Sequence, residues 1–448
     1  MTETSPLTYP GLRTPRLWQK FGYILDPAQF LDRLGQVAPD IANAPVIGSA
    51  PTMLLVSHPE GLKQLFNNEA KQFGAPANNL LRPVVGERSI FSLEGQRHRR
   101  ERKLLMPPFH GDRMRSYGDV ICQLAREQMV QQPIGQVFVM REIAQSIALD
   151  VILQTVFGLD ESDRSRQIAA KIVELTACFQ SKLFLAALFL PVLQRDLGVF
   201  RPWTRFSHVR NEAKALIIEE IRARRSQVDP SRTDILSLML AARDEDGNAM
   251  DEDELHDELM TLLIAGHETT ANSIAWAMYW ISQHPEVRDR LVEELRTQTT
   301  QDPAEVARLP YLNAVCNEAM RLYPSVMMTV PRRTLEATEI LGYSVPAGIN
   351  LYGCIYITHR NPAIYPDPLR FHPDRFLDRQ YTPYEFLPFG GGVRRCLGEA
   401  LAIFELRLVI ATILRDFSVV YADTQPERPV RRGVSLTPNH GVRLKRLA

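Results

Sequence analysis

The chain has 448 residues, and its 52 lysines and arginines balance its 52 aspartates and glutamates, so the net charge is zero at pH 7. This balance gives no overall field that would attract nucleic acid or an acidic membrane surface. The five cysteines are widely spaced and form no C-x-x-C pair, which indicates reduced thiols without a disulfide framework or structural zinc. We therefore expect a cytoplasmic protein with no nucleic-acid partner.

The start of the chain carries no targeting signal that we can identify. Residues 1–15 are punctuated by proline and lack the basic and apolar regions of a secretion signal. The longest apolar run, residues 183–193, contains Pro191 and is much shorter than the roughly 20 residues that a membrane span needs. The sequence predicts a soluble protein without a transmembrane anchor. Because no linker or composition break follows about residues 1–15, residues 1–448 are expected to form a single domain.

The predicted elements, taken in chain order, begin with a helix over residues 30–42. From residue 59 to about 313, charges recur at three- and four-residue spacing, which indicates mostly helix, including one long helix over residues 251–283. A further helix is predicted over residues 310–323. Strand-like sequence comes from both ends of the chain: residues 45–57, 329–356, 417–421 and 434–447. The pattern predicts a mainly α fold with a small β portion.

The segment Phe389–Gly398, FGGGVRRCLG, places Cys396 behind three glycines and two arginines. A buried thiolate needs such compensation, because otherwise its pKa rises and it stays a thiol. Glycines let the backbone approach a large ligand and leave N–H groups free to point at the sulfur. The following helix directs its positive end toward the same place. These features favour a cysteine that ligates a metal cofactor over an ordinary buried cysteine in a turn.

The segment resembles the haem-binding signature of the cytochrome P450 family, F-x-x-G-x-R-x-C-x-G, at every specified position: Phe389, Gly392, Arg394, Cys396 and Gly398. The resemblance implies a triangular prism of helices with a small β-rich lobe. It also implies heme b (iron protoporphyrin IX) with Cys396 as its axial thiolate. The segments over residues 386–402 and 430–444 look most like a soluble bacterial type, from a cyanobacterial branch with fatty-acid and terpenoid members.

The middle of the long helix reads AGHETT, beginning at Ala265. Gly266 costs roughly 1 kcal/mol relative to alanine inside a helix, so the helix can open there and hold water. The segment resembles the family's oxygen-activation motif, which places Ala265 at the haem. The motif implies that Thr269 hydrogen-bonds dioxygen and that Glu268 relays the protons for O–O cleavage. A small-residue packing site with a solvated glutamate is the alternative.

Glu318 and Arg321 lie three residues apart on one helix, within the largely apolar segment LNAVCNEAMRLYP. Most such pairs are exposed and contribute little, but the apolar surroundings predict a buried pair. The pair resembles the family's E-x-x-R motif, and Arg375 in HPDRF fits the third member of that motif. The resemblance implies a structural role, in which the three residues hold the loop that presents Cys396.

The basic segment QRHRRERK, residues 96–103, is most simply a solvated helix face. His98 and Arg102 lie four residues apart on one face, and they match positions where relatives bind a haem propionate, although many relatives have tryptophan at the first. Arg332 and Arg394 resemble further propionate ligands. The remaining cations are expected to form a positive face for a small acidic electron carrier: Arg99, Arg100, Lys103 and Arg395.

The substrate pocket is expected to be aliphatic, with walls from Leu80, Leu81, Leu262, Ala265, Val326, Met328 and Leu436. The apolar run within residues 179–193 either roofs this pocket or packs in the core. A lipophilic substrate is predicted, most simply a long-chain fatty acid or a terpenoid.

The leading interpretation is a haem-thiolate monooxygenase that inserts one atom of O2 into a C–H or C=C bond. Its electrons are expected from NAD(P)H through a ferredoxin or flavodoxin with a reductase, since 448 residues leave no room for a fused reductase. A monomer is expected. The alternatives are a peroxygenase or isomerase on the same fold, which often lacks the acid–alcohol pair, and a non-catalytic haem-binding sensor.

Overall fold

The computed structural model describes residues 9–48, 50–68, 72–74, 82–109, 113–158, 163–178, 184, 202–227, 229, 232–298 and 300–447. Helices dominate: α1 Arg16–Leu25, α2 Pro27–Val37, α3 Pro59–Asn67, α5 Arg82–Val85, α6 Gly95–Leu105, η1 Pro107–Phe109, α7 Arg113–Val130, α8 Met140–Phe157, α9 Asp163–Cys178, α11 Pro202–Ser226, α12 Ile235–Ala241, α13 Glu252–Gln283, α14 Pro285–Thr297, α15 Pro303–Val306, α16 Pro310–Leu322, α17 Ile355–Thr358, α18 Arg375–Asp378, η3 Gly392–Arg394 and α19 Glu399–Asp416. The strands are short: β1 Ile41–Asn43, β2 Met53–Val56, β3 Phe73–Gly74, β4 Val137–Val139, β5 Arg332–Thr334, β6 Thr338–Ile340, β7 Tyr343–Val345, β8 Asn350–Gly353, β9 Val419–Tyr421, β10 Pro429–Arg432, β11 Ser435–Pro438 and β12 Arg443–Arg446.

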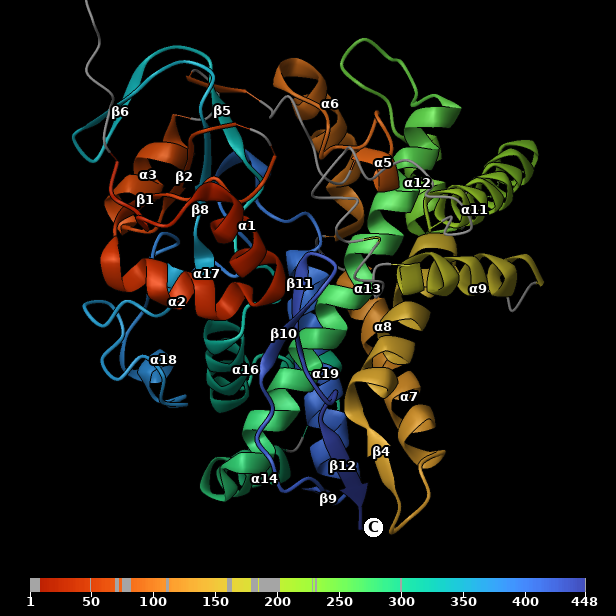
Figure 1. The fold of residues 1–448 in the computed structure, drawn as a ribbon. Helices are drawn as coiled ribbons and strands as arrows, with labels where there is room; N and C mark the ends of the chain where they lie inside the picture. Colours follow the sequence, from red (N-terminus) through yellow and green to blue (C-terminus); the bar gives the residue numbers. More distant parts are fainter. Residues whose placement is uncertain are drawn as a thin grey trace, which may run out of the picture.

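Helix α13 crosses the molecule from the level of α12 to that of α14 (Figure 1). Its 32 residues extend over about 48 Å. A capping box fixes its start, because the Asp251 carboxylate accepts from the Glu254 N–H and the Glu254 carboxylate accepts from the Asp251 N–H, both at 2.9 Å. α13 packs against α8, α16 and α19. Its middle therefore lies inside the largest apolar core.

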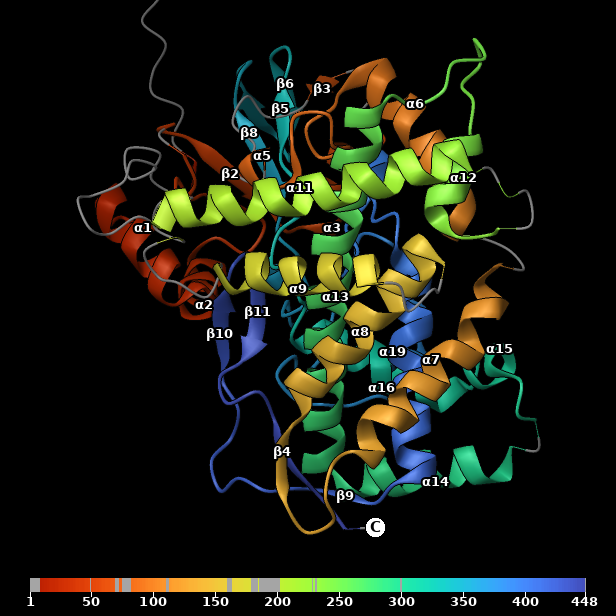
Figure 2. The same ribbon diagram turned by 90° about the vertical axis from the view of Figure 1, so that its right-hand side faces the viewer.

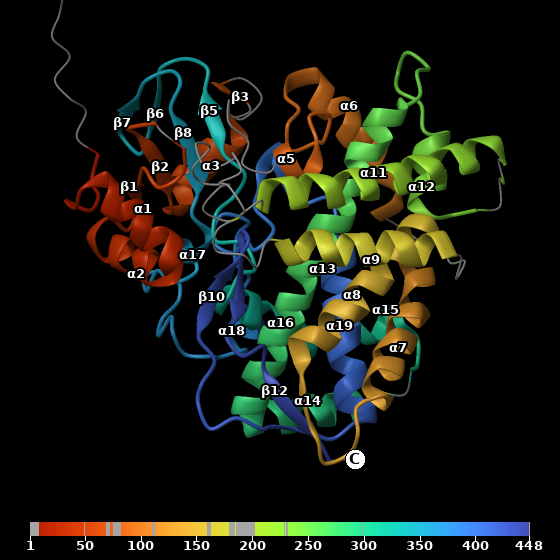
Figure 3. The same cartoon turned by 45° about the vertical axis from the view of Figure 1, so that its right-hand side comes forward.

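Strands from distant parts of the chain pair with each other. Among the described residues the largest sheet has the order β1-β2-β8-β5-β3, and β2 runs parallel to β8 with Met53 opposite Asn350. Likewise β12, near residue 448, pairs with β4 and β9. Figure 3 shows the largest sheet and α1–α3 on one side, and the helices around α13 on the other. This arrangement confirms the mainly α fold with a small β-rich lobe.

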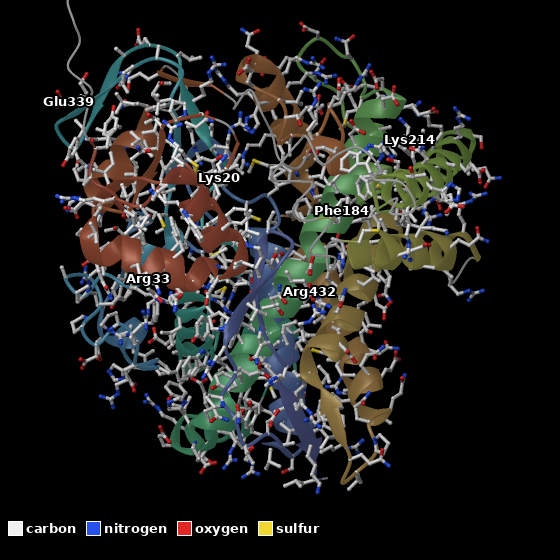
Figure 4. The ribbon with its side chains drawn as sticks, in the orientation of Figure 1. Lys20, Arg33, Phe184, Lys214, Glu339 and Arg432 are labelled. Atoms are coloured by element: carbon white, nitrogen blue, oxygen red, sulfur yellow. The ribbon has the colours of Figure 1, made fainter. Side chains whose placement is uncertain are left out.

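Helices α9 and α11 lie side by side across α13 (Figure 2) and contact each other along their lengths. Of the apolar run over residues 183–193, only Phe184 is among the described residues. Phe184 is fully buried, with ring centroids 6.0 Å from Trp203 and 4.7 Å from Phe206 (Figure 4). This residue packs in the core. Within the described ranges, no helix is both long and apolar enough to cross a membrane.

The boundaries near the start of the chain differ from the prediction. The helix predicted over residues 30–42 is α2, which begins at Pro27 because the Asp26 carboxylate accepts from the Gln29 N–H at 2.9 Å. Residues 41–43 do not continue that helix, since they pair as β1 with β2, with Ile41 opposite Val56. Within the strand-like range predicted over residues 45–57, residues 45–48 carry no strand and residues 53–56 form β2. α1 and β10 were not predicted.

Candidate functional site

The cysteine loop is a closed turn that ends at the start of α19. The Cys396 N–H donates to the Phe389 carbonyl at 3.1 Å, and the Arg395 N–H donates to the Gly392 carbonyl at 3.2 Å. Gly390 has φ of +69°, a left-handed conformation that favours glycine, and Gly392 has the same value. The loop therefore needs glycine at these two positions to bring Cys396 in front of the helix.

Gly391 has a different requirement, since its backbone lies against the Phe66 ring of α3. A Cβ atom added to Gly391 would lie 2.5 Å from two ring carbons of Phe66. The Arg332 guanidinium lies 5.0 Å from the centroid of that ring, and Arg332 Nη2 donates to the Gly391 carbonyl at 2.7 Å. Arg332 is 1% exposed. It thus supports the loop directly, a role that was not predicted for it.

Cys396 is an exposed residue, yet its thiol is strongly desolvated by the surrounding protein. Desolvation raises the pKa of the Cys396 thiol to about 11, although a hydrogen bond from the Gly398 backbone and the charges of Arg102 and Arg395 lower it. The thiol is therefore protonated at pH 7 when no cation lies beside it. A positive ion or a metal at the sulfur would stabilise the thiolate.

Cationic side chains converge on His98 of α6, which is 4% exposed. Burial lowers the pKa of His98 to about 4, with further lowering by the charges of Arg394, Arg102, Arg332 and Arg99. His98 is therefore neutral at pH 7. The structure brings together the four residues predicted as propionate ligands, which come from α6, β5 and the cysteine loop.

Two of these arginines also tie α6 and the segment before it to the cysteine loop. Arg102 Nη1 donates to the Arg395 carbonyl at 2.7 Å, and Arg394 Nη2 donates to the Leu93 carbonyl at 2.8 Å. A cavity of about 50 Å³ lies beside the cluster, with walls that include His98, Arg394 and Glu94. The cluster is therefore part of the fold as well as a candidate site for an acidic group.

Three of the four cations predicted to form a positive face have acidic partners. Arg100 Nε lies 2.6 Å from Asp244, Lys103 Nζ lies 2.8 Å from Glu245, and Arg395 Nε lies 2.5 Å from Glu399. The loop before α13 supplies two of these acids, at positions far from α6 in the sequence. The expectation of a uniformly positive face is corrected to a face of mixed sign.

The middle of α13 continues through Gly266 without interruption. The Thr269 hydroxyl donates to the Ala265 carbonyl at 2.7 Å, and the Thr270 hydroxyl donates to the Gly266 carbonyl at 2.8 Å. A Cβ atom on Gly266 would lie 3.1 Å from Ile152 of α8, so close helix packing is one reason for glycine there. The opening that the sequence suggested at Gly266 is absent from this described helix.

Glu268 is partly buried and directly precedes Thr269 on α13. Desolvation raises the pKa of its carboxyl group to about 7, and the positive charge of Arg141 opposes this increase. Arg141 is a buried residue of α8, and desolvation lowers its own pKa. Sequence reasoning missed Arg141, because no local pattern marks a residue more than 100 positions away as a neighbour of Glu268.

Glu318 and Arg321 form a fully buried ion pair on α16. Arg321 Nε lies 2.6 Å from Glu318 Oε2 and Nη2 lies 2.8 Å from Oε1, while Arg375 Nε lies 3.1 Å from Oε1. All three side chains are at most 6% exposed. The His372 N–H also donates to Glu318 Oε1, at 3.0 Å. The structure thus brings together the three residues expected to meet.

His359 connects this network to the cysteine loop. Arg321 Nη1 donates to the His359 carbonyl at 2.7 Å, and the Leu387 N–H donates to His359 Nε2 at 3.0 Å. The Gly390 N–H donates in turn to the Leu387 carbonyl at 2.9 Å. Burial holds the pKa of His359 well below its usual range, so Nε2 stays available as an acceptor. No local pattern in the sequence marks His359 as part of this network.

The positions expected to line the substrate pocket are divided between two cores. Leu80 and Leu81 lie outside the described residues. Leu262 belongs to the core around α13 and is 9% exposed, whereas Met328 and Leu436 pack in the core beneath α1 and α2. Val326 is partly buried and bridges to Ser435. Leu436 is fully buried and presents no exposed surface to a ligand.

Residues 46–446 match the sequence family described as Cytochrome P450. The chain is 36% identical to cytochrome P450 135B1 of Mycobacterium tuberculosis (strain ATCC 25618 / H37Rv), over 88% of this chain and 82% of that protein. It is 33% identical to cytochrome P450 138 of the same strain, over 97% and 95%.

Solved structures show the same fold. A retinoic acid-bound cyanobacterial CYP120A1 superimposes with a TM-score of 0.84 at 24% identity, over 98% of this chain and 99% of that one. The haem domain of cytochrome P450DA gives a TM-score of 0.81 at 22% identity, over 95% and 94%. The chain belongs to the cytochrome P450 family. It is a bacterial haem-thiolate protein of the monooxygenase class, and its cofactor is heme b with an axial cysteine thiolate.

The residues around the cysteine loop fit that cofactor. A Cβ atom added to Gly398, two residues beyond Cys396, would meet no atom within 4 Å, so the backbone borders open space there. The thiol of Cys396 is desolvated, and a metal ion bound to it would stabilise its thiolate form. The cations around neutral His98 suit a group that carries two carboxylates.

Proposed function

We propose that this protein is a monooxygenase in which Cys396 is the axial ligand of the haem. The observation that carries the proposal is the pairing of two features in one core. The desolvated Cys396 thiol lies just before the start of α19, and Glu268 and Thr269 lie in the middle of α13, which packs against α19. A haem carrier without catalysis has no need of an acid with a pKa near 7.

The bound haem supplies the redox centre at which O2 is activated. Glu268, with a pKa of about 7, is protonated in part of the molecules at neutral pH, so it can both accept and release a proton. The Thr269 hydroxyl holds a proton toward the Ala265 carbonyl at 2.7 Å and can reorient to donate elsewhere. Arg102, Arg332 and Arg394 would hold the haem carboxylates.

The Glu318 network would keep the cysteine loop in place during the reaction. Its carboxylate is held by two arginines and a backbone N–H, and the network continues through His359 to the loop. A buried ion-pair network of this kind stays rigid, because moving any charged member leaves a buried charge unpaired. We assign these residues to loop support and not to proton transfer.

The proposed reaction places one oxygen atom in a C–H or C=C bond of a lipophilic substrate and releases the other as water. A long-chain fatty acid or a terpenoid is the proposed substrate, which the aliphatic positions Leu262, Val326 and Met328 support. An electron pair from NAD(P)H would reach the haem through a ferredoxin or flavodoxin with its reductase. We also propose that the protein is a cytoplasmic monomer. It would belong to the cyanobacterial branch of the family that has fatty-acid and terpenoid members.

The reduced carbon monoxide spectrum tests the ligand. The holoprotein should give the Soret band position of a thiolate ligand, and Cys396→His should shift the band to the histidine position. A histidine-type spectrum from the unaltered protein would remove the proposal. Oxygen dependence then separates the reactions: a monooxygenase needs O2 and an electron donor, whereas a peroxygenase forms product with peroxide alone and an isomerase needs neither.

A further inference from the structure

Helix α1 presents its apolar side chains outward. Leu17, Trp18, Phe21 and Leu25 are 67%, 71%, 53% and 75% exposed, and all four lie within ten residues. Their spacing places them along one stripe of the helix. The buried residues of α1 are Gln19 and Tyr23, and Ile24 packs against the core beneath the helix. The helix therefore carries a second apolar face, which points outward and not toward the core.

The inward face of α1 is firmly attached, so the helix cannot simply turn over. The Gln19 amide donates to the carbonyls of Leu12 and Thr14 at 3.0 and 2.8 Å. Tyr23 packs edge-on against Phe30 at a centroid distance of 5.7 Å, and the Arg431 guanidinium lies 4.2 Å from the Tyr23 ring. Lys20, labelled in Figure 4, donates to the Gly48 carbonyl. These contacts fix the apolar stripe on the outside of the molecule.

The surroundings of the stripe are basic. Between Tyr9 and Leu25 the sequence contains Arg13, Arg16 and Lys20 and no acidic residue. Arg13 and Arg16 are exposed at the start of the helix. The first acid that follows, Asp26, caps α2. The segment between Tyr9 and Leu25 is therefore apolar and positively charged, although the whole chain of 448 residues has no net charge.

We propose that α1 binds an anionic lipid surface and lies in the plane of that surface. An exposed apolar stripe with tryptophan and flanking arginines suits the boundary between headgroups and acyl chains, where Trp18 can sit at the headgroup level. Anionic headgroups attract Arg13 and Arg16. A second copy of the chain is a poorer occupant, because pairing two such faces brings like charges together. α1 lies at the outer edge of the molecule in Figures 2 and 3, where a flat surface can reach it.

Co-sedimentation of the haem-loaded chain with vesicles tests the inference. Vesicles that contain phosphatidylglycerol should bind the protein, whereas vesicles of phosphatidylcholine alone should bind it much more weakly. Replacing Trp18 and Phe21 by alanine should weaken binding by about tenfold or more. Arg13→Gln with Arg16→Gln should weaken it by about fivefold for each cation removed. Ile134→Ala, which removes an apolar side chain that is 63% exposed between α7 and β4, is the matched control and should bind normally.

Brominated lipids give a second readout. Of the four tryptophans, Trp18 is the exposed one, whereas Trp276 is fully buried and Trp203 and Trp280 are partly buried. Quenching of fluorescence on vesicle binding should therefore disappear in Trp18→Ala. Failure to bind phosphatidylglycerol vesicles, or equal binding to neutral ones, would overturn the inference. A third result would also overturn the inference: the free protein self-associates, Trp18→Ala abolishes this self-association, and the unaltered protein does not bind vesicles. The carbon monoxide spectrum of each variant confirms an intact fold, and none of these readouts depends on the monooxygenase reaction.

Discussion

Replacing Glu268 by glutamine removes a titrating group at the centre of the proposed site while it keeps the shape of the side chain. Burial raises the Glu268 pKa from 4.5 to about 7. Because the folded-state value lies above the unfolded one, the contribution of Glu268 to stability is full below about pH 4.5. It is lost as the pH rises through about 7. The loss amounts to about 3 kcal/mol across that window.

Denaturant unfolding of the holoprotein at several pH values measures this effect. The free energy of unfolding of the unaltered chain should fall, relative to Glu268→Gln, by up to about 3 kcal/mol between pH 5 and pH 8. The comparison isolates Glu268, since all other titrating groups are common to both proteins. Identical pH dependence in the two proteins would refute the assigned pKa.

Glu405→Gln is the matched control for the catalytic part of the argument. Glu405 is a buried residue of α19, and desolvation raises its pKa to about 8, so its removal also changes the pH dependence of stability. Only Glu268→Gln should lower the amount of product formed per electron consumed, because only Glu268 lies beside Thr269. If Glu405→Gln uncouples the reaction equally, a general loss of stability and not proton transfer explains both results.

Further predictions concern Thr269, the ion-pair network and the cysteine loop. Thr269→Ala should lower product formation by up to about 10²-fold while the electron donor is still consumed and peroxide appears; unchanged coupling would contradict a proton-donating role. Glu318→Gln leaves two buried guanidinium groups without their carboxylate and should cost about 3–5 kcal/mol, seen as a lower Tm and a smaller yield of haem-loaded protein. Gly391→Ala should cost about 1–3 kcal/mol through its contact with Phe66, and Phe66→Leu should restore part of that loss. Stability that does not change in Gly391→Ala would show that the Phe66 ring moves freely.

Local sequence was sufficient where the chemistry depends on residues close together in the chain. The glycines, arginines and cysteine of residues 389–398 predict a thiolate ligand, because one turn supplies the whole arrangement. The spacing of Glu318 and Arg321 predicts their ion pair for the same reason, since a helix places them on one face. The charge and apolar spacing likewise predicts the long helix over residues 251–283, which is α13.

Local sequence was insufficient near the start of the chain. Residues 16–25 follow a proline-rich segment, and their exposed residues are apolar, so the usual rule for an amphipathic helix does not show which side of α1 faces the core. Contacts with distant residues, such as that of Arg431 with Tyr23, determine which side of α1 faces the core. In the same way, Ile41–Asn43 form a strand because β2 is beside them, although their composition also suits a helix.

The sequence by itself therefore determined the family, the cofactor and the residue that we assign as its ligand, because these depend on short motifs whose members are neighbours in the chain. The tertiary structure decided which charges compensate one another. It paired Arg100 with Asp244, placed Arg141 near Glu268, and used Arg332 to hold the Gly391 carbonyl. The physical reason is that charge interactions and desolvation depend on distance in space, which becomes fixed only when segments far apart in the chain pack together.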